Sequence, residues 1–321
     1  MRPRVAITVG DPRGIGPEIA RKVLQPAPEN ADCVLIGPAE QVCDVGVECI
    51  VVDLSRGERE TGKGKREKGE GPGREVGCGA LPIEEAGRLV ALQVEKAVSL
   101  ALEGSVDAIV TGPAEKRALH AAGYAYPGHT EWLGVLAGGV DTAMMLTTGD
   151  LRVVLATTHI ALNRVPRALT VERVVAVGQL TVTALRDWWG MAAPRVAICA
   201  LNPHAGEDGL FGAEDEAVLA PAARELGAIG PVPADTVFVR ALGGEFDAVI
   251  APYHDVGMTA VKVSGFGRGV NVTLGLPFVR TSPDHGTAFD IAGQGIADPS
   301  SMQEAVSLAV RLARKSASVG R

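Results

Sequence analysis

The sequence predicts an α/β protein, and three of its features point to that fold class. Short runs rich in Val, Ile and Ala have the composition of buried parallel strands. They alternate with longer stretches in which apolar residues recur every three or four positions, as they do along one face of a helix. Several of the runs end in loops of Gly, Pro, His or Asp. This alternation is typical of a parallel sheet whose strands are joined by crossover helices.

The apolar pattern also predicts the residue ranges of these strands and helices. Strands are expected at residues 5–9, 34–37, 50–53, 108–111, 143–147, 153–157, 195–200 and 248–251. Helices are expected at residues 17–24, 84–102, 171–189, 214–226 and 301–313. A further strand-like run, VNVTLG, begins at Val270. Each helical stretch has one apolar face, so most of these helices should lie on the surface with that face buried.

The segment 56–75 differs from the rest of the chain. It has six glycines, seven basic and five acidic residues, and no aliphatic side chain to bury. We therefore expect a solvated loop or a disordered insert. A basic ligand-binding arm is the alternative, but the two signs of charge nearly cancel.

Length and charge limit the classes of function. A chain of 321 residues with 46% hydrophobic residues is long enough for about two domains. A net charge of -7 provides no basic field for nucleic acid or anionic membrane, and no apolar stretch is long enough to span a membrane. We expect a cytoplasmic protein. The five cysteines form no CxxC pair, so neither a disulfide framework nor a thiolate zinc site is indicated.

Three histidines follow expected strands and form a candidate metal site. His159 closes LATTHI, His204 lies in LNPHAGEDG, and His254 lies in APYHDVG. If the three loops meet at one edge of the sheet, neutral imidazoles could bind a divalent ion and leave positions open for substrate. Taken singly, each histidine could instead be a hydrogen-bonded structural residue.

Two further features could bind a phosphorylated ligand. Lys262, Asn271 and Arg280 lie around VNVTLG and suit a phosphate and a carboxylate, although each could be an ordinary surface residue. The loop GDPRGIGPEI, residues 10–19, has glycines that could bring backbone N–H groups to a ligand or could only form a tight turn. It is not a GxGxxG fingerprint. Neither this loop nor TGPAEK, residues 111–116, is a Walker loop.

A series of motifs resembles the 4-hydroxythreonine-4-phosphate dehydrogenase (PdxA) family in order and spacing. These motifs are GDPRGIGPEI, TGPAEKRAL, PGHTEWL, LATTHIAL, LNPHAGEDGLFGAED, PADTVF, YHDVGM, GFGRGVNVTLGLPFVRTSPDHGTA and DIAGQGIADP. The resemblance covers nearly the whole chain and is missing only at roughly residues 40–80. The chain departs from the family at Val256, where YHDQG is common, and at the charged insert, which replaces a less polar region.

The resemblance implies a metal site and a substrate site. The implied ligands of zinc, magnesium or cobalt are His159, His204 and His254, the trio already indicated by the strand ends. The implied substrate-binding residues are His129, Thr130, Lys262, Asn271 and Arg280. The resemblance further implies a homodimer with its active site at the subunit interface, so that ligands can come from both chains.

The implied fold is that of isocitrate and isopropylmalate dehydrogenases, two α/β/α domains around a central cleft. The expected domains are residues 1–112 with 265–321, and residues 113–264 with the metal-ligand loops. Those enzymes share the Gly-Ile-Gly-Pro-Glu turn and the segment 285–299 with this chain. The cofactor NAD, with NADP as the alternative, is therefore expected near Gly10, Gly14, Gly16, His285 and Asp298.

The implied reaction is NAD-dependent oxidation and decarboxylation of 4-phosphohydroxy-L-threonine to 3-amino-2-oxopropyl phosphate, in pyridoxal phosphate biosynthesis. The metal would favour the substrate alkoxide and then the enolate left by carbon dioxide. Candidates for the base are His129, Lys262 and Asp255. One alternative is the same chemistry on D-threonate or D-erythronate 4-phosphate. A non-catalytic metal-binding regulator and phosphate acyl transfer on a similar scaffold are more remote.

Overall fold

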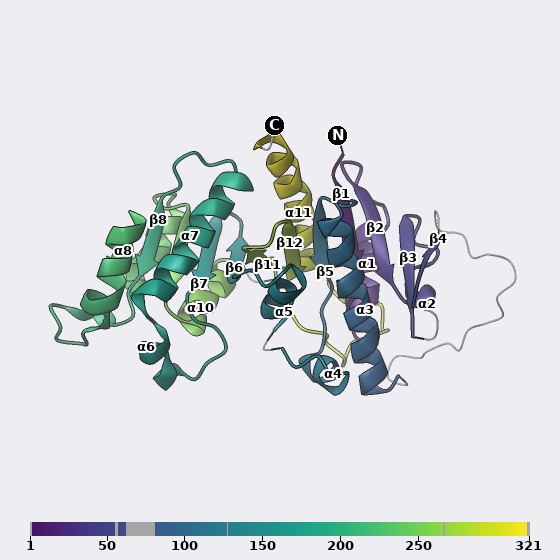
Figure 1. Ribbon diagram of the computed structural model, residues 1–321, viewed down its shortest axis with the longest axis horizontal. Coiled ribbons are helices and arrows are strands. Elements are labelled where there is room, and N and C mark those ends of the chain that lie inside the picture. The colour runs from purple at the N-terminus through teal and green to yellow at the C-terminus, as the bar shows by residue number, and fades with distance from the viewer. Residues whose placement is uncertain (1, 55–56, 62–80, 127, 266, 320–321) are drawn as a thin grey trace, which may run out of the picture. The chain divides into compact units, whose positions relative to one another are not determined.

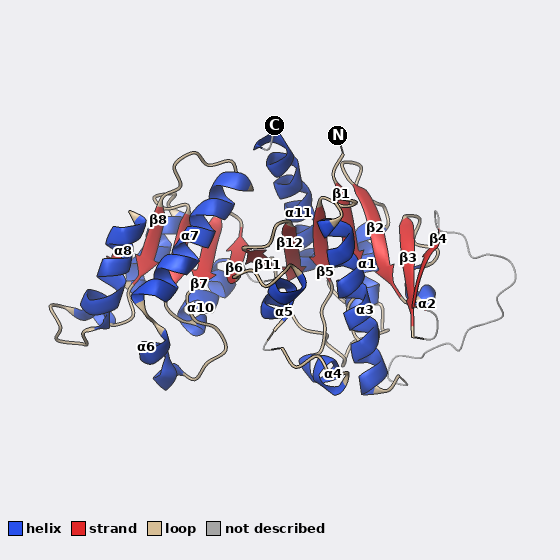
Figure 2. Cartoon of the chain, in the orientation of Figure 1, coloured by secondary structure: helices blue, strands red, loops and turns tan. Residues whose placement is uncertain are grey.

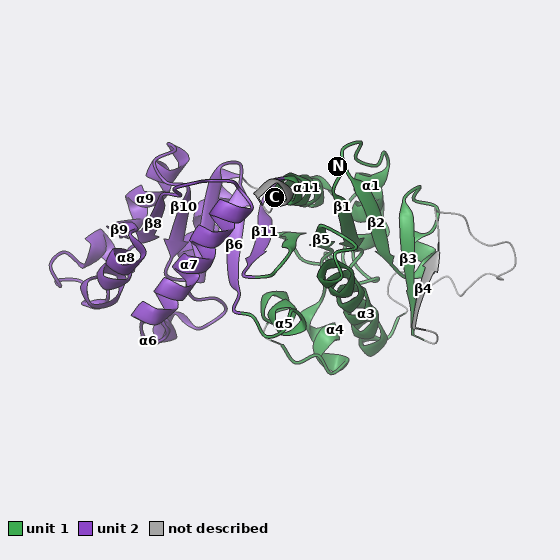
Figure 3. Cartoon of the chain, turned by 45° about the horizontal axis from the view of Figure 1, so that its top comes forward, with its two compact units in different colours: residues 1–140, 276–314 green, residues 141–275, 315–321 purple. Residues whose placement is uncertain are grey.

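The chain divides into two compact units in a computed structural model that describes residues 2–54, 57–61, 81–126, 128–265 and 267–319 (Figure 1). Unit 1 is Met1–Val140 with Leu276–Arg314, and unit 2 is Asp141–Gly275 with Lys315–Arg321 (Figure 3). We expected the chain to cross between domains near residues 112 and 265. Residues 113–140 belong instead to unit 1, where their two short helices pack on its longest helix. Residues 265–275 belong to unit 2, so the return crossing also lies later in the chain than expected.

The sheet of unit 1 has the strand order β4-β3-β2-β1-β5-β12. Its strands are β1 (Arg4–Thr8), β2 (Asp32–Gly37), β3 (Glu48–Asp53), β4 (Gly57–Thr61), β5 (Ala108–Thr111) and β12 (Val279–Pro283). All neighbouring pairs are parallel except β3 with β4. Val5, Ala6 and Ile7 of β1 are fully buried, which explains why its sequence is a continuous apolar run.

Helices flank the strands of unit 1 (Figure 2). They are α1 (Gly16–Leu24), α2 (Ala39–Val42), α3 (Ile83–Leu102), α4 (Lys116–Ala121), α5 (His129–Leu136) and α11 (Ser300–Val319), whose last residues belong to unit 2. Along α3 the buried Ala86, Val90, Val94 and Ala97 recur at helical spacing. Val90, Val94 and Ala97 form one core with Ile109 of β5 and with residues of α5.

The sheet of unit 2 has the strand order β11-β6-β7-β10-β8-β9. Its strands are β6 (Ala143–Thr148), β7 (Leu151–Leu155), β8 (Val196–Cys199), β9 (Ile229–Val232), β10 (Ala248–Ala251) and β11 (Val270–Leu274). Pairs β7–β10, β10–β8 and β8–β9 are parallel, whereas β6 pairs antiparallel with both β7 and β11. The longer helices are α7 (Val171–Asp187), α8 (Ala220–Leu226), α9 (Ala234–Leu242) and α10 (His254–Ser264).

The structure confirms the α/β class, and it adds antiparallel pairs to the parallel strands that the sequence predicted. Strands β6 and β7 are joined by a two-residue turn, Gly149 and Asp150, too short for a parallel crossover. The expectation of a loop at 56–75 is wrong for residues 57–61, which pair with β3 as strand β4. The remainder of that segment lies outside the described residues.

The helices of this chain are short or carry many charged residues. Within the described ranges, no single helix is long and apolar enough to cross a membrane. In the same part of the chain, one bent pair, Leu162–Ala168 and Val171–Asp187, reaches the required length and composition, with 88° between its two parts.

Candidate functional site

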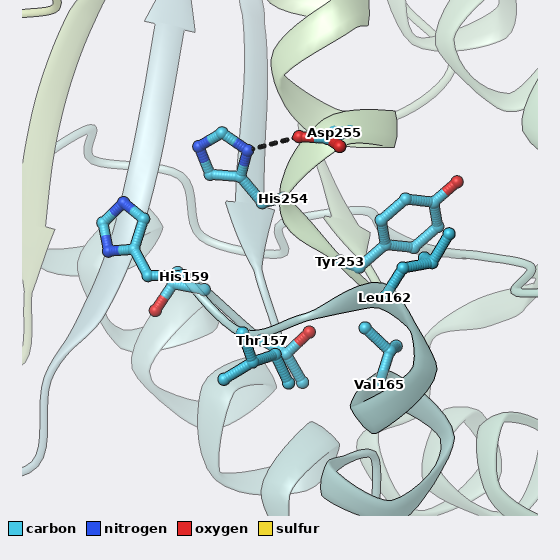
Figure 4. Close-up of a pocket in the computed structure, with 9 residues that line it drawn as sticks. Thr157, His159, Leu162, Val165, Tyr253, His254 and Asp255 are labelled. Carbon is cyan, nitrogen blue, oxygen red and sulfur yellow. Dashed lines mark hydrogen bonds and ion pairs between the residues drawn. The ribbon is translucent and has the colours of Figure 1, made fainter.

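A small pocket in unit 2 holds two of the three histidines proposed as metal ligands (Figure 4). Its volume is about 240 Å³. His159, in the loop after β7, and His254 and Asp255, at the start of α10, provide polar groups, while Leu162 and Val165 line the apolar side. The pocket therefore lies at the carboxyl end of two strands, where open α/β sheets bind ligands.

The two loops that form this pocket leave the sheet side by side. Strands β7 and β10 are parallel neighbours, so the chain leaves both of them at the same edge. The Thr157 hydroxyl donates a buried hydrogen bond to the Pro252 carbonyl at 2.7 Å and joins one loop to the other. As a result, the ring centroids of His159 and His254 are 5.5 Å apart.

The ring of His254 has a carboxylate beside it. Its Nδ1 lies 2.7 Å from Oδ1 of Asp255, as the dashed line in Figure 4 shows. A carboxylate on Nδ1 fixes the orientation of an imidazole and leaves Nε2 for a ligand, which is common among metal-binding histidines. His159 adopts φ of +48°, a strained value for a residue other than glycine.

His204 does not join this pair in the described chain. It lies in a left-handed turn, with φ of +53° at His204, +58° at Ala205 and +41° at Glu207. The His204 side chain is 69% exposed, with Nδ1 3.4 Å from a Glu207 carboxylate oxygen. Its ring meets the ring of Phe211 edge-on, with 6.2 Å between the centroids.

These positions fit a divalent metal only in part. Over the ranges that the structure describes, no group of three or more His, Cys, Asp or Glu side chains is placed to hold a metal ion. A catalytic zinc site usually has three protein ligands and an open position. One chain in this conformation supplies two of the three imidazoles that the sequence pointed to.

Asp215 anchors the segment that leads to His204. This carboxylate is 1% exposed and opens a turn of π-helix, η3 (Asp215–Leu219). It accepts hydrogen bonds from the backbone N–H groups of Leu201 and Asn202, at 2.8 and 3.0 Å, and from Nδ2 of Asn202 at 2.9 Å. The chain after β8 is therefore fixed before it enters the left-handed turn.

Unit 1 contains a buried guanidinium. Arg280, in β12, is 3% exposed, and its Nη2 donates to Oγ1 of Thr111 at 2.6 Å. Burial lowers the pKa of Arg280 to about 10, because desolvation penalises the charged form. The side chain still carries its charge at neutral pH. A phosphate or carboxylate ligand would stabilise such a buried cation.

His129 lies close enough to Arg280 for the positive charge of the guanidinium to lower its pKa. Burial, and next the positive charge of Arg280, lower the pKa of His129 to about 3. The imidazole is neutral at physiological pH, and its Nε2 is buried without a hydrogen-bond partner. The ring lies 5.9 Å from that of Trp132, and the next residue, Thr130, is buried. Neutral His129 can hydrogen-bond to a ligand, but it is a weak base.

The other two proposed substrate-binding residues belong to unit 2. Lys262 lies two helical turns along α10 from His254 and is half-buried. Asn271, in β11, is also half-buried, and its Oδ1 is buried without a hydrogen-bond partner. An amide oxygen in that state can accept a hydrogen bond from the amino or hydroxyl group of a ligand.

The glycines proposed to bind the cofactor allow segments of unit 1 to pack closely together. Gly10 has φ of +79°, and a Cβ there would lie 2.2 Å from the Pro113 carbonyl oxygen. The Gly10 N–H donates to Oε1 of Gln93 at 3.0 Å, and Nε2 of Gln93 donates back to the Gly10 carbonyl at 3.0 Å. The Gly14 N–H donates to the Asp11 carbonyl. These two N–H groups are thus used inside the protein.

The same loop packs on the segment that carries His285 and Asp298. The Ile15 N–H donates to the Thr287 carbonyl oxygen at 2.9 Å. A Cβ added to Gly14 would lie 2.7 Å from the same oxygen, and a Cβ added to Gly16 would clash with Val9. Hydrogen bonds from Ser300 lower the pKa of Asp298, and the nearby His285 adds to this effect. Unit 1 therefore brings the two expected cofactor segments together.

Sequence reasoning missed three residues that support these sites: Thr111, Gln93 and Asp215. Thr111 could have been noticed, since it ends a strand and opens TGPAEK. Gln93 lies within an expected helix and carries no distinguishing pattern, whereas Asp215 closes the motif LNPHAGEDGLFGAED and could have been noticed there. Their roles depend on which backbone groups the fold brings to them.

Comparison with known proteins gives a consistent result. Residues 67–309 match the model of the family described as pyridoxal phosphate biosynthetic protein PdxA. A putative D-threonate 4-phosphate dehydrogenase of Bradyrhizobium diazoefficiens is 44% identical, with 96% of each chain covered. A 4-hydroxythreonine-4-phosphate dehydrogenase of Geobacter metallireducens is 42% identical, with 99% of this chain and 98% of the relative covered. The crystal structure of 4-hydroxythreonine-4-phosphate dehydrogenase from Klebsiella pneumoniae is 38% identical, covers 98% of both chains and superposes with a TM-score of 0.82.

Proposed function

The chain belongs to the PdxA family of pyridoxal phosphate biosynthetic proteins, and from this premise we propose its reaction. We propose NAD-dependent oxidation and decarboxylation of 4-phosphohydroxy-L-threonine to 3-amino-2-oxopropyl phosphate. The observation that carries this proposal is the buried, charged guanidinium of Arg280 beside the neutral imidazole of His129. A site of that kind suits an anionic substrate group.

The proposed substrate-binding residues are His129, Thr130, Lys262, Asn271 and Arg280, and together they would orient the substrate. Arg280 and Lys262 would neutralise the phosphate and carboxylate charges, while His129, Thr130 and Asn271 would donate or accept hydrogen bonds. Holding three substrate groups at once fixes the carbon that is oxidised, which lowers the barrier through orientation.

In the proposed reaction the hydroxyl-bearing carbon loses a hydride to the nicotinamide cofactor, and the hydroxyl loses a proton. The resulting β-keto acid loses carbon dioxide, and a proton takes its place. Of the three candidate bases, His129 is disfavoured by its pKa of about 3. Lys262 and Asp255 stay as candidates, and Asp255 is already bound to the ring of His254.

We further propose a homodimer in which histidines from both copies hold a divalent metal ion. The support is that His159 and His254 lie together in one chain, whereas His204 is turned toward Glu207. A bound zinc, magnesium or cobalt ion would supply a Lewis acid at the substrate hydroxyl. The cofactor is proposed to bind near Gly10, Gly14, Gly16, His285 and Asp298, with NADP as the alternative to NAD.

The second candidate substrate is a four-carbon sugar-acid phosphate, D-threonate or D-erythronate 4-phosphate. It is favoured by the 44% identity to a protein named putative D-threonate 4-phosphate dehydrogenase. The same charged residues would bind its phosphate and carboxylate. Threonate phosphate replaces the amino group of phosphohydroxythreonine by a hydroxyl, so the reaction and the proposed site are otherwise unchanged.

A parallel assay distinguishes the two candidates. Purified protein is mixed with NAD or NADP, added divalent metal and each substrate in turn, and reduced cofactor is followed by its absorbance. Turnover of the amino substrate with a higher kcat/KM supports the pyridoxal phosphate assignment, and preference for threonate phosphate supports the second. No turnover of either substrate would contradict both, and activity that survives a chelator would contradict the metal proposal.

A further inference from the structure

The strand register places Thr111 and Arg280 on the same face of the unit 1 sheet. Strands β5 and β12 are parallel, and Arg280 is paired with Ile109. Side chains alternate between the faces along a strand, so Ile109 and Thr111 share a face with Arg280. Thr111 lies two residues farther toward the carboxyl end, about 6.6 Å along the strand, which an arginine side chain can span.

The contact between the two side chains is short and shielded from water. The distance from Nη2 of Arg280 to Oγ1 of Thr111 is 2.6 Å, and the two residues are 3% and 1% exposed. Hydrogen bonds from a charged donor are stronger than neutral ones, particularly where water does not compete. The Thr111 hydroxyl can therefore restrict the guanidinium to one orientation.

The groups around Arg280 on this face indicate which kind of ligand the oriented guanidinium binds. His129, at the start of α5, senses the positive charge of Arg280 and carries a buried Nε2 with no hydrogen-bond partner. A buried cation beside a neutral hydrogen-bonding group suits an anion. The adjacent Thr281 lies on the opposite face, where its hydroxyl donates to the Ala305 carbonyl of α11 at 2.8 Å.

We propose that Thr111 is a positioning residue for substrate binding: its hydroxyl holds Arg280 in the orientation that receives the phosphate group of the substrate. Thr111 acts through Arg280 and does not itself touch the substrate. The inference rests on the proposed role of Arg280. An arginine that is already ordered loses less conformational freedom when the anion binds, so affinity rises.

Three variants separate this role from a general loss of stability. Thr111→Val removes the hydroxyl with little change of volume, and Thr111→Ser keeps a hydroxyl. Thr281→Val is the matched control, because it removes an equally buried threonine hydroxyl bond from the other face of the same sheet. The measurements are KM and kcat on the substrate that wild type turns over, and the Kd of inorganic phosphate by calorimetry, which needs no turnover.

We expect Thr111→Val to raise KM and the phosphate Kd about 10- to 100-fold and to change kcat less than about threefold. This is the size of effect expected when a hydrogen bond to a charged group is lost. Thr111→Ser should restore most of the affinity, and Thr281→Val should lose stability but bind like wild type. Four results would each overturn the inference. They are unchanged phosphate affinity in folded Thr111→Val, no rescue of affinity by Thr111→Ser, an equal loss of affinity in Thr281→Val, and no phosphate binding by wild type. If wild type binds phosphate but turns over neither substrate, the proposed function fails, while the phosphate comparison still decides the role of Thr111.

Discussion

At the scale of single residues, burial has opposite consequences for the charge of Arg280 and His129. Desolvation disfavours the charged form of both side chains. The pKa of Arg280 falls only to about 10, so it stays a cation, whereas that of His129 falls to about 3 and the ring is neutral. The pair therefore offers one positive charge and one neutral hydrogen-bonding group to an anion. The resemblance named both residues, but their protonation states depend on burial that the sequence does not show.

The neutral state of His129 predicts a pH dependence of stability. Its folded pKa of about 3 lies below the ordinary value of 6.5, so the unfolded chain binds the proton more readily between these values. The contribution of His129 to stability is complete above about pH 6.5 and is lost as the pH falls toward 3. His129→Gln removes this titration. Between about pH 7 and pH 5, wild type should lose more unfolding free energy than the variant, by at most about 1.4 kcal/mol per pH unit.

Urea unfolding of both proteins at several pH values measures this difference. Inorganic phosphate should reduce it, because an anion near Arg280 favours the protonated imidazole. Parallel pH profiles for wild type and His129→Gln would show that His129 is not held neutral in the folded protein.

At the scale of elements, the sequence predicted the segments that bury a continuous apolar face. Strand β10 occurs at the expected residues, and α3 differs from its expected range by one residue at its start. Strand β12 was missed because its sequence, VRTSP, includes polar residues that are buried in the fold. Helix α10 was missed because its first residues had been assigned to a ligand-binding loop after β10. His254 both begins the helix and faces the pocket.

Asp215, the first residue of η3, should stabilise the segment that leads to His204. Asp215→Asn replaces the buried carboxylate, which accepts three hydrogen bonds, by an uncharged amide. In either orientation the amide NH2 faces a backbone N–H, because one carboxylate oxygen accepts from Leu201 and the other from Asn202. We expect a loss of about 2–4 kcal/mol of unfolding free energy. Glu216→Gln, at the exposed next position, is the matched control and should change stability by less than about 0.5 kcal/mol. Urea unfolding followed by circular dichroism tests both, and equal stability of the two variants would contradict the anchoring role of Asp215.

At the scale of the whole molecule, spacing along one chain could not settle how the histidine trio is completed. Strand order determines which loops are neighbours, and β7 and β10 are paired, so His159 and His254 meet. His204 follows β8, and the left-handed turn beside it directs its ring toward Glu207 and Phe211. The sequence could identify three strand-end histidines. It could not show that one chain brings only two of them together, because this depends on backbone angles that are unusual for residues other than glycine.

The proposed homodimer makes a prediction that only mixed assemblies can test. His204→Ala and His254→Ala should each abolish metal-dependent activity and lower the bound metal measured by mass spectrometry. If His204 completes a site in the partner, a dimer of one variant with the other contains one intact site and one that lacks both ligands. Random exchange of equal amounts puts half of the chains in mixed dimers, so about a quarter of wild-type activity and bound metal should return. Each variant exchanged with itself is the control and should recover nothing. If the mixture also recovers neither activity nor metal while mass spectrometry shows that mixed dimers have formed, His204 and His254 act from the same chain, and the loop carrying His204 must then rearrange to reach its pair.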